Sequence, residues 1–248
     1  MERQANVPHK IRTGLIMKYL LLVGWAFFIG SCQRANYQQI APPFETDYAL
    51  NRFENTIRAY EKQDSTEFPK VNGIVFAGSS SFFFWKNIKQ DLAPLNIINR
   101  GFGGSTLPEV LYYANRSIVK YQPKTVVIYC ENDLYGTKPK TPAQMRNAYV
   151  ALVKSLRASL PKVELYFVSV KPSPLRWKQW NEASEVNRLI GEFIKTQKRH
   201  HYVDITGVML KNGKPDGSIF LADSLHMNPE GYRRWTQVLK PILTKSPI

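Results

Sequence analysis

The sequence of 248 residues is poor in cysteine and histidine, with two of the first and four of the second. Its cysteines, Cys32 and Cys130, provide no disulfide framework and no paired-cysteine set for zinc. The sequence also lacks His-Glu-x-x-His and the phosphate-binding Gly-x-x-x-x-Gly-Lys-Ser/Thr. Gly101-x-Gly103 follows an apolar run, but the dinucleotide fingerprint is incomplete because position 106 is threonine. We therefore expect no metal and no cofactor.

Acidic residues are also scarce, 19 against 34 lysines and arginines, so the formal net charge is +15. Such an excess can indicate nucleic acid, an anionic membrane surface or an acidic polymer as a partner. The bases are scattered along the chain, however, and no nucleic-acid-binding motif accompanies them. The densest cluster, residues 195–201, is typical of the solvated last turn of a helix, which places His200 and His201 at a helix end. We expect no nucleic-acid partner.

The apolar stretch near the N-terminus, residues 19–28, is too short to span a bilayer. It follows Lys18 and leads into Ile29-Gly30-Ser31-Cys32. A basic start, a short apolar core and small residues at the end are typical of a secretory signal peptide. The residues up to Cys32 also resemble the bacterial lipobox, in which that cysteine is acylated and becomes the mature N-terminus. This resemblance predicts a lipoprotein with its lipid on Cys32.

The chain is thereby divided into three parts. Residues 1–31 form the predicted signal peptide, whose start can equally be Met17. Residues 32–47 form a lipidated tether, and residues 48–248 form one domain that is long enough for a full core. We expect the protein in a bacterial cell envelope, bound to a membrane through its N-terminal lipid and facing the periplasm or the cell surface. The sequence contains no signal for the oligomeric state.

Short apolar runs alternate with amphipathic segments through the predicted domain. The runs predict five strands, at residues 74–77, 96–99, 125–129, 162–170 and 201–204. Apolar residues at helical spacing predict helices before the first strand, between the strands and after the last, including one continuous helix over residues 107–118. Strands that alternate with helices in this way imply an α/β fold with a parallel sheet covered on both faces.

Polar residues gather where these runs end. The first strand stops at Gly78-Ser79-Ser80-Ser81, the third is followed by Glu131-Asn132-Asp133, and Asp223-Ser224-Leu225-His226 precedes the last helix. In an open α/β sheet, ligands bind at the carboxyl edge of the strands. Each stretch alone also has an ordinary interpretation, since serines cap helices and an isolated Asp-x-x-His is usually a polar loop. Their joint presence favours a catalytic site.

A serine hydroxyl becomes a useful nucleophile when a neighbouring base takes its proton. His226 is the candidate base, and Asp223 can reach one nitrogen of its ring. Together with Asn99 to Thr106, the stretches above resemble the SGNH hydrolase superfamily, also called GDSL esterases and lipases, over about residues 70–240. The resemblance implies a flavodoxin-like three-layer α/β/α sandwich with strand order 2-1-3-4-5. It also implies a catalytic set of Ser80, Asp223 and His226, and an oxyanion hole made by Ser80, Gly104 and Asn132.

Two positions depart from the pattern of this superfamily. Its Gly-Asp-Ser is here Gly78-Ser79-Ser80, and Ser79 can still accept from backbone N–H groups in place of the missing carboxylate. Cys130 stands where a glycine usually lies two residues before the oxyanion asparagine, and we expect it to be a small buried filler. The serine run leaves Ser79, Ser80 and Ser81 as possible nucleophiles, and spacing from Gly78 selects Ser80.

The resemblance implies a serine esterase that hydrolyses carboxylic esters by acyl transfer. The Gly-Phe-Gly-Gly-Ser and Glu-Asn-Asp stretches are most similar to a branch with platelet-activating-factor acetylhydrolase-like proteins and bacterial carbohydrate acetylesterases. This suggests a short acyl group, such as acetyl, on a glycan or lipid. The alternatives are a lysophospholipase or thioesterase with a longer acyl pocket, and a non-catalytic glycan-binding lipoprotein.

Overall fold

The computed structural model describes residues 46, 48–136 and 138–246. The predicted signal peptide, Cys32 and all of the predicted tether except residue 46 lie outside these residues. Within the described ranges, no helix is long and apolar enough to cross a membrane.

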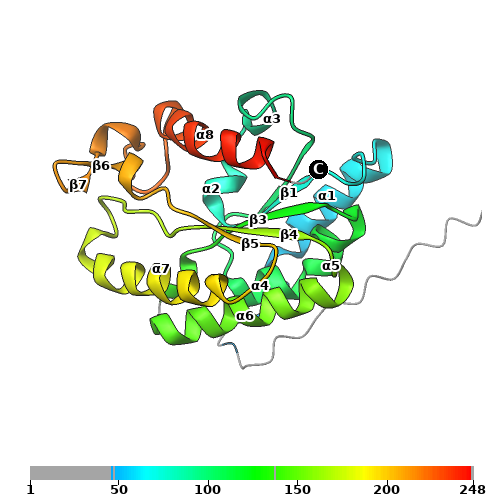
Figure 1. The fold of residues 1–248 in the computed structure, drawn as a ribbon, viewed down its shortest axis with the longest axis horizontal. Coiled ribbons are helices and arrows are strands. Elements are labelled where there is room, and N and C mark those ends of the chain that lie inside the picture. Colours follow the sequence, from blue (N-terminus) through cyan, green and yellow to red (C-terminus); the bar gives the residue numbers. More distant parts are fainter. Residues whose placement is uncertain (1–45, 47, 137, 247–248) are drawn as a thin grey trace, which may run out of the picture. The chain divides into compact units, whose positions relative to one another are not determined.

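Five parallel strands form the central sheet, in the order β2-β1-β3-β4-β5 (Figure 1). The strands are β1 (Ile74–Gly78), β2 (Ile97–Gly101), β3 (Thr125–Tyr129), β4 (Glu164–Val168) and β5 (His200–Val203). A two-stranded antiparallel sheet pairs β6 (Leu210–Lys211) with β7 (Lys214–Pro215). The predicted α/β fold and its strand order 2-1-3-4-5 are therefore confirmed.

Helices cover both faces of the sheet (Figure 1). One face carries α1 (Glu54–Thr66), α4 (Leu107–Tyr112), α5 (Ala114–Ser117), α6 (Pro142–Ser159) and α7 (Trp180–Lys195), and the other carries α2 (Ser80–Phe83), α3 (Ile88–Asp91) and α8 (Pro229–Thr244). Successive side chains of a strand point to opposite faces of the sheet. On β1, Val75 packs on the face that carries α6 and α7, and Phe76 packs on the face that carries α8. Short 3-10 helices connect these elements: η1 (Leu50–Phe53), η2 (Val119–Tyr121), η3 (Asn132–Leu134), η4 (Trp177–Gln179), η5 (Gly207–Met209) and η6 (Gly217–Ile219).

Two local predictions are wrong. The helix predicted over residues 107–118 is two short helices, because the backbone at Tyr113 leaves the helical region at φ −95° and ψ 4°. His200 does not end a helix but begins β5, five residues beyond the end of α7. His201 follows it on β5, as the strand predicted at residues 201–204 implied, and does not end a helix either. His200 points into the core, where the Tyr149 hydroxyl lies 2.6 Å from its Nε2, and burial lowers its pKa to about 3. It is therefore a neutral core residue.

Candidate active site

Ser80 lies at the carboxyl edge of the sheet, where β1 turns into α2. Gly78 makes this turn possible, because its φ is +137° and a Cβ there would lie 1.7 Å from the Tyr129 carbonyl oxygen on β3. Ser79 and Ser81 are enclosed, at 0% and 2% exposure, whereas Ser80 is 7% exposed. We expected the Ser79 hydroxyl to accept from backbone N–H groups in place of the missing carboxylate. It has no hydrogen-bond partner, so this expectation is wrong. This burial favours Ser80 among the three serines.

Asp223 and His226 lie in one tight turn before α8. The Asp223 Oδ2 is 2.6 Å from His226 Nδ1, and its Oδ1 accepts from the backbone N–H groups of Leu225 and His226 at 3.0 and 2.9 Å. Burial raises the pKa of Asp223, but these hydrogen bonds outweigh it and lower the pKa to about 2. The ionised carboxylate favours the proton on Nδ1, which leaves Nε2 to accept one from a hydroxyl.

The histidine ring lies against the turn that begins at Ser80. The ring centroids of His226 and Phe84 are 4.8 Å apart, and the Phe84 N–H donates to the Ser80 carbonyl at 2.8 Å. In the part of the chain that the structure describes, no hydrogen bond joins the Ser80 hydroxyl to His226. Catalytic hydrogen bonds without substrate are often long, so the missing bond does not argue against Ser80 and His226 as partners.

Gly104 lies in the loop after β2, beside Ser80. The neighbouring Gly103 is close to Ser80, since a Cβ at Gly103 would lie 4.0 Å from the Ser80 Cβ. Gly104 itself has a φ of +80° and open space where a Cβ would be. The glycine is thus required by the backbone conformation, while the open space leaves room for a substrate. The Arg52 Nη2 donates to the Gly104 carbonyl at 3.0 Å and so holds this peptide group.

Asn132 begins η3 after β3 and faces the same loop. Its Nδ2 donates to the Ser105 carbonyl at 3.1 Å, and its Oδ1 accepts from Arg176 Nη2 at 3.0 Å. One N–H of the amide is therefore left for another acceptor. The side chain does not bond its own backbone, as asparagines in turns often do. The buried Cys130 also donates to the Ser105 carbonyl, at 3.0 Å, and burial raises its pKa well above the ordinary value.

A buried ionic cluster that was not predicted from the sequence lies next to Asn132 and consists of Glu131, Lys171 and Arg176. The Lys171 Nζ lies 2.5 Å from Glu131 Oε1, and the Arg176 Nη1 lies 3.1 Å from Glu131 Oε2. Burial raises the pKa of Glu131, but its two cations outweigh burial and lower the pKa to about 2. Lys171 and Arg176 follow β4, so their place after a predicted parallel strand was the signal that could have found them.

Asp133, on the other side of Asn132, is buried without a cation bonded to it. Its Oδ2 accepts from the Leu107 N–H at 2.8 Å, while its Oδ1 has no hydrogen-bond partner. Burial raises the pKa of Asp133 to about 7, and the bond from Leu107 offsets only part of this rise. In the described ranges, no group of three or more His, Cys, Asp and Glu side chains could hold a metal ion.

A cavity of about 280 Å³ adjoins Gly104 and Asn132. Its walls come from η1 and the preceding residues, the loop after β2, and the segment after β3, and its lining includes Tyr48, Arg52, Asp133, Tyr135, Lys138 and Lys140. This is a small and polar cavity. Two residues predicted for the oxyanion hole, Gly104 and Asn132, line this cavity.

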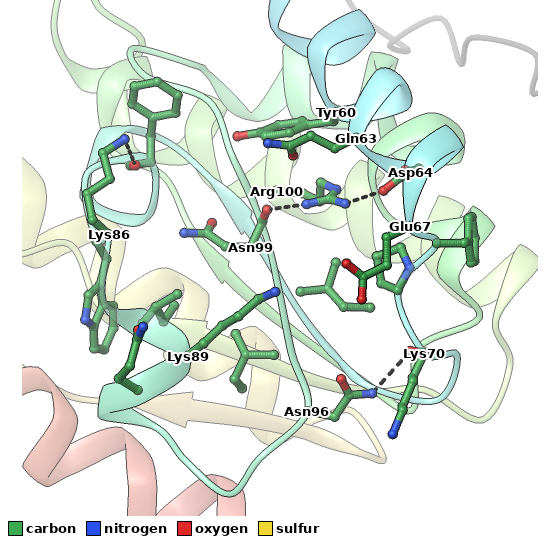
Figure 2. A pocket seen from close by; sticks show the side chains of 18 of the residues that line it. Tyr60, Gln63, Asp64, Glu67, Lys70, Lys86, Lys89, Asn96, Asn99 and Arg100 are labelled. Atoms are coloured by element: carbon green, nitrogen blue, oxygen red, sulfur yellow. Dashed lines mark hydrogen bonds and ion pairs between the residues drawn. The ribbon is translucent and has the colours of Figure 1, made fainter.

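A larger groove of about 1140 Å³ runs along β2, the edge strand of the sheet (Figure 2). It contains none of the predicted site residues. Its buried polar groups are paired with one another: Figure 2 shows Arg100 bonded to Asp64 and to the Asn99 carbonyl, and Asn96 bonded to the Lys70 carbonyl. Ser80, Asp223 and His226 line neither space, and the small cavity is favoured because Gly104 and Asn132 line it.

Comparison with protein families gives one match that spans most of the chain. The profile of the GDSL-like lipase/acylhydrolase family matches residues 74–234. The matched segment begins at β1 and ends within α8, so it includes every residue predicted for the site. No curated protein matches the sequence.

Solved structures share the fold at low sequence identity. A GDSL-like lipase from Bacteroides thetaiotaomicron has a TM-score of 0.66 at 18% identity, with 80% of this chain and 100% of that chain covered. A protein from Streptococcus pneumonia described as a candidate platelet activating factor has a TM-score of 0.67 at 19% identity. The match covers 78% of this chain and 94% of that chain. A family 3 carbohydrate esterase from Talaromyces cellulolyticus has a TM-score of 0.56 at 14% identity. The match covers 69% of this chain and 96% of that chain.

Proposed function

The chain belongs to the GDSL-like lipase/acylhydrolase family and is a carboxylic ester hydrolase, and from this premise we propose that it removes short acyl groups, such as acetyl, from a glycan or lipid. The cavity beside Gly104 and Asn132 carries this proposal. At about 280 Å³ it is slightly smaller than most small-molecule sites, whose volumes are roughly 300–1,000 Å³. A volume this small also suits a small acyl group better than a long hydrocarbon chain.

In the proposed reaction, the Ser80 hydroxyl attacks the ester carbonyl while His226 Nε2 takes its proton. Asp223 keeps the ring oriented and stabilises the imidazolium that forms. The negative charge on the carbonyl oxygen is accepted by the N–H groups of Ser80 and Gly104 and the amide of Asn132, each donor contributing about 2.7–4 kcal/mol. His226 then protonates the leaving alkoxide. A water molecule deprotonated by His226 releases the acid and restores Ser80.

A Ser80→Ala variant tests this mechanism in the full-length protein. With aryl acetate, butyrate and octanoate as substrates, we expect acetate to be hydrolysed with the highest kcat/KM. Loss of the nucleophile should lower kcat by at least a thousandfold. Ser65→Ala is the matched control, because the Ser65 hydroxyl lies on the exposed surface of α1 and bonds only the Lys62 carbonyl.

The other outcomes contradict the proposal in different ways. A preference for octanoate would indicate the longer acyl pocket of a lysophospholipase or thioesterase. Binding of acetylated glycans without turnover of any ester would indicate a non-catalytic lipoprotein. Equal activity in wild type and Ser80→Ala would exclude Ser80 as the nucleophile.

We also propose that the protein is exported and anchored by a lipid on Cys32 in a bacterial cell envelope. The basic start, the short apolar stretch and the Ile-Gly-Ser-Cys sequence support this proposal. In a bacterial host, the wild type should partition into the detergent phase of a membrane extract, whereas Cys32→Ala should lose its lipid and enter the aqueous phase. Aqueous partitioning of both proteins would contradict lipid anchoring.

A further inference from the structure

Arg176 reaches the candidate oxyanion hole from a loop to which the sequence analysis assigned no role. The loop follows β4, and its Arg176 Nη2 donates to Asn132 Oδ1 at 3.0 Å. A carbonyl oxygen is the only atom of the amide that can accept from a guanidinium. The bond from Asn132 Nδ2 to the Ser105 carbonyl requires the same orientation. Two independent partners therefore turn the N–H₂ group in one direction.

We propose that Arg176 is a positioning residue for ester hydrolysis, which holds the Asn132 amide so that its remaining N–H points at the developing oxyanion. This inference rests on the proposed function. Hydrogen bonds in a low-dielectric environment polarise one another, so a guanidinium on Oδ1 also makes the Nδ2 hydrogens stronger donors. Because this donor is oriented before the reaction, no free energy is spent on turning it in the transition state.

Arg176 is itself held in place. Its Nη1 forms an ion pair with Glu131 Oε2 at 3.1 Å, and its guanidinium lies 3.9 Å from the centre of the Tyr135 ring. Lys171 occupies the other oxygen of Glu131, and the hydroxyl of Tyr129 is 3.2 Å from Lys171 Nζ. Both Glu131 and Lys171 are buried, and the Arg176 side chain is only 14% exposed. A side chain with so many partners has little freedom to rotate.

The charges of the cluster also favour the reaction. Two cationic side chains, Lys171 and Arg176, flank the single carboxylate of Glu131, and Arg176 brings its positive charge to the Asn132 amide. Burial reduces solvent screening, and this charge therefore stabilises an oxyanion held by Asn132. Arg176 acts through Asn132, because the observed contact is with the amide oxygen.

The same loop also contacts the turn that holds the candidate base. The Leu175 N–H donates to the Ser224 carbonyl at 3.1 Å, and Ser224 lies between Asp223 and His226 in the chain. Two adjacent residues of this loop therefore contact both parts of the site. Arg176 contacts Asn132 of the candidate oxyanion hole, and Leu175 contacts the turn that carries His226. Four loops were assigned to the site from the sequence, and the loop after β4 is a fifth.

The test compares Arg176→Met with Arg116→Met in the full-length protein, using an aryl acetate. Arg116 is a matched control, because its side chain is 13% exposed and binds two carboxylates, Glu54 and Glu61, outside the site. We expect kcat to fall about 10–100-fold in Arg176→Met with KM within about twofold. Arg116→Met should lose stability and keep its kcat. A purely structural role for Arg176 would make the two variants alike.

A double-mutant cycle sharpens this test. If Arg176 acts through Asn132, then adding Arg176→Met to Asn132→Ala should lower kcat no further than Asn132→Ala alone. Arg176→Lys keeps a charge for Glu131 but not the planar fork, so it should fold and show an intermediate kcat. Should Arg176→Met fail to fold, Arg176→Lys carries the comparison.

The outcomes separate this inference from the proposed function. If wild type hydrolyses the ester in a Ser80-dependent manner but both Arg176 variants keep their kcat, only the role of Arg176 is overturned. Additive losses in the double-mutant cycle would also overturn it, since they would show that Arg176 acts independently of Asn132. If wild type shows no Ser80-dependent hydrolysis, the proposed function fails and the inference fails with it.

Discussion

Glu131 and Asp133 lie on either side of Asn132, and both carboxyl groups are buried, but the protein shifts their pKa values in opposite directions. Glu131 is 1% exposed and Asp133 is 3% exposed. Burial and two opposing cations give Glu131 a pKa of about 2. Burial with one backbone donor raises the pKa of Asp133 to about 7. Burial alone therefore does not determine the charge of a carboxyl group, and its bonded partners do.

The two sides of Asn132 have different uses as a result. On the Glu131 side, an ionised carboxylate holds Lys171 and Arg176 next to the proposed oxyanion hole. On the Asp133 side, a carboxyl group with a raised pKa accepts from the first N–H of α4 and carries less negative charge at neutral pH than an ordinary aspartate. A second full negative charge there would oppose the charge that develops in ester hydrolysis. The difference suits a site that stabilises an anion.

The largest expected effect is that of Glu131→Gln. The change removes the partner of a buried lysine and of Arg176, so we expect a loss of about 3–5 kcal/mol in the free energy of unfolding. We expect kcat for an aryl acetate to fall as well, because Arg176 loses its ion pair. Urea unfolding at pH 7 and steady-state kinetics measure the two effects.

Glu185→Gln is the matched control for this change. Glu185 pairs with Arg188 on the exposed surface of α7, where the two side chains are 42% and 53% exposed. Its urea midpoint should stay at the wild-type value, because exposed ion pairs contribute little. If Glu131→Gln were as stable as this control, the cluster at Glu131 would have no role in holding the site together.

A smaller effect is expected from Asp133, and it depends on pH. The folded protein binds a proton here more tightly than the unfolded chain does, so stability falls as pH rises from 3.8, the ordinary pKa, to about 7. The loss is at most about 4 kcal/mol and is complete only above pH 7. In Asp133→Asn this part of the pH dependence should disappear, so the variant should gain stability relative to wild type as pH rises.

Urea unfolding of wild type and Asp133→Asn at several pH values measures this difference. Glu131 contributes with the opposite sign, because its pKa is lowered in the fold: its contribution is present above pH 4.5 and is lost as pH falls toward 2. The two contributions therefore occupy different pH ranges. Parallel stability curves for wild type and Asp133→Asn between pH 4 and 8 would show that Asp133 is ionised in the folded protein.

Much of the fold could be predicted because its signals are local. Apolar runs of four to nine residues marked all five strands, and the motif resemblance supplied the strand order that the structure confirms. The helix was predicted to extend to His200 because nothing in the basic segment from residue 195 onward marks where the helix stops. The end is set by pairing of β5 with β4, which is a contact between distant parts of the chain.

Of the site, the sequence by itself determined which residues are available: a serine after a buried strand, an Asp-x-x-His turn, and a glycine and an asparagine on neighbouring loops. Chemistry and spacing are local properties, so they can be read along the chain. Only the tertiary structure decided that Asn132 is held by Arg176, 44 residues away, and that the pKa of Glu131 is lowered while that of Asp133 is raised. Orientation and ionisation depend on burial and on partners that the sheet brings together, and no short stretch of sequence encodes these.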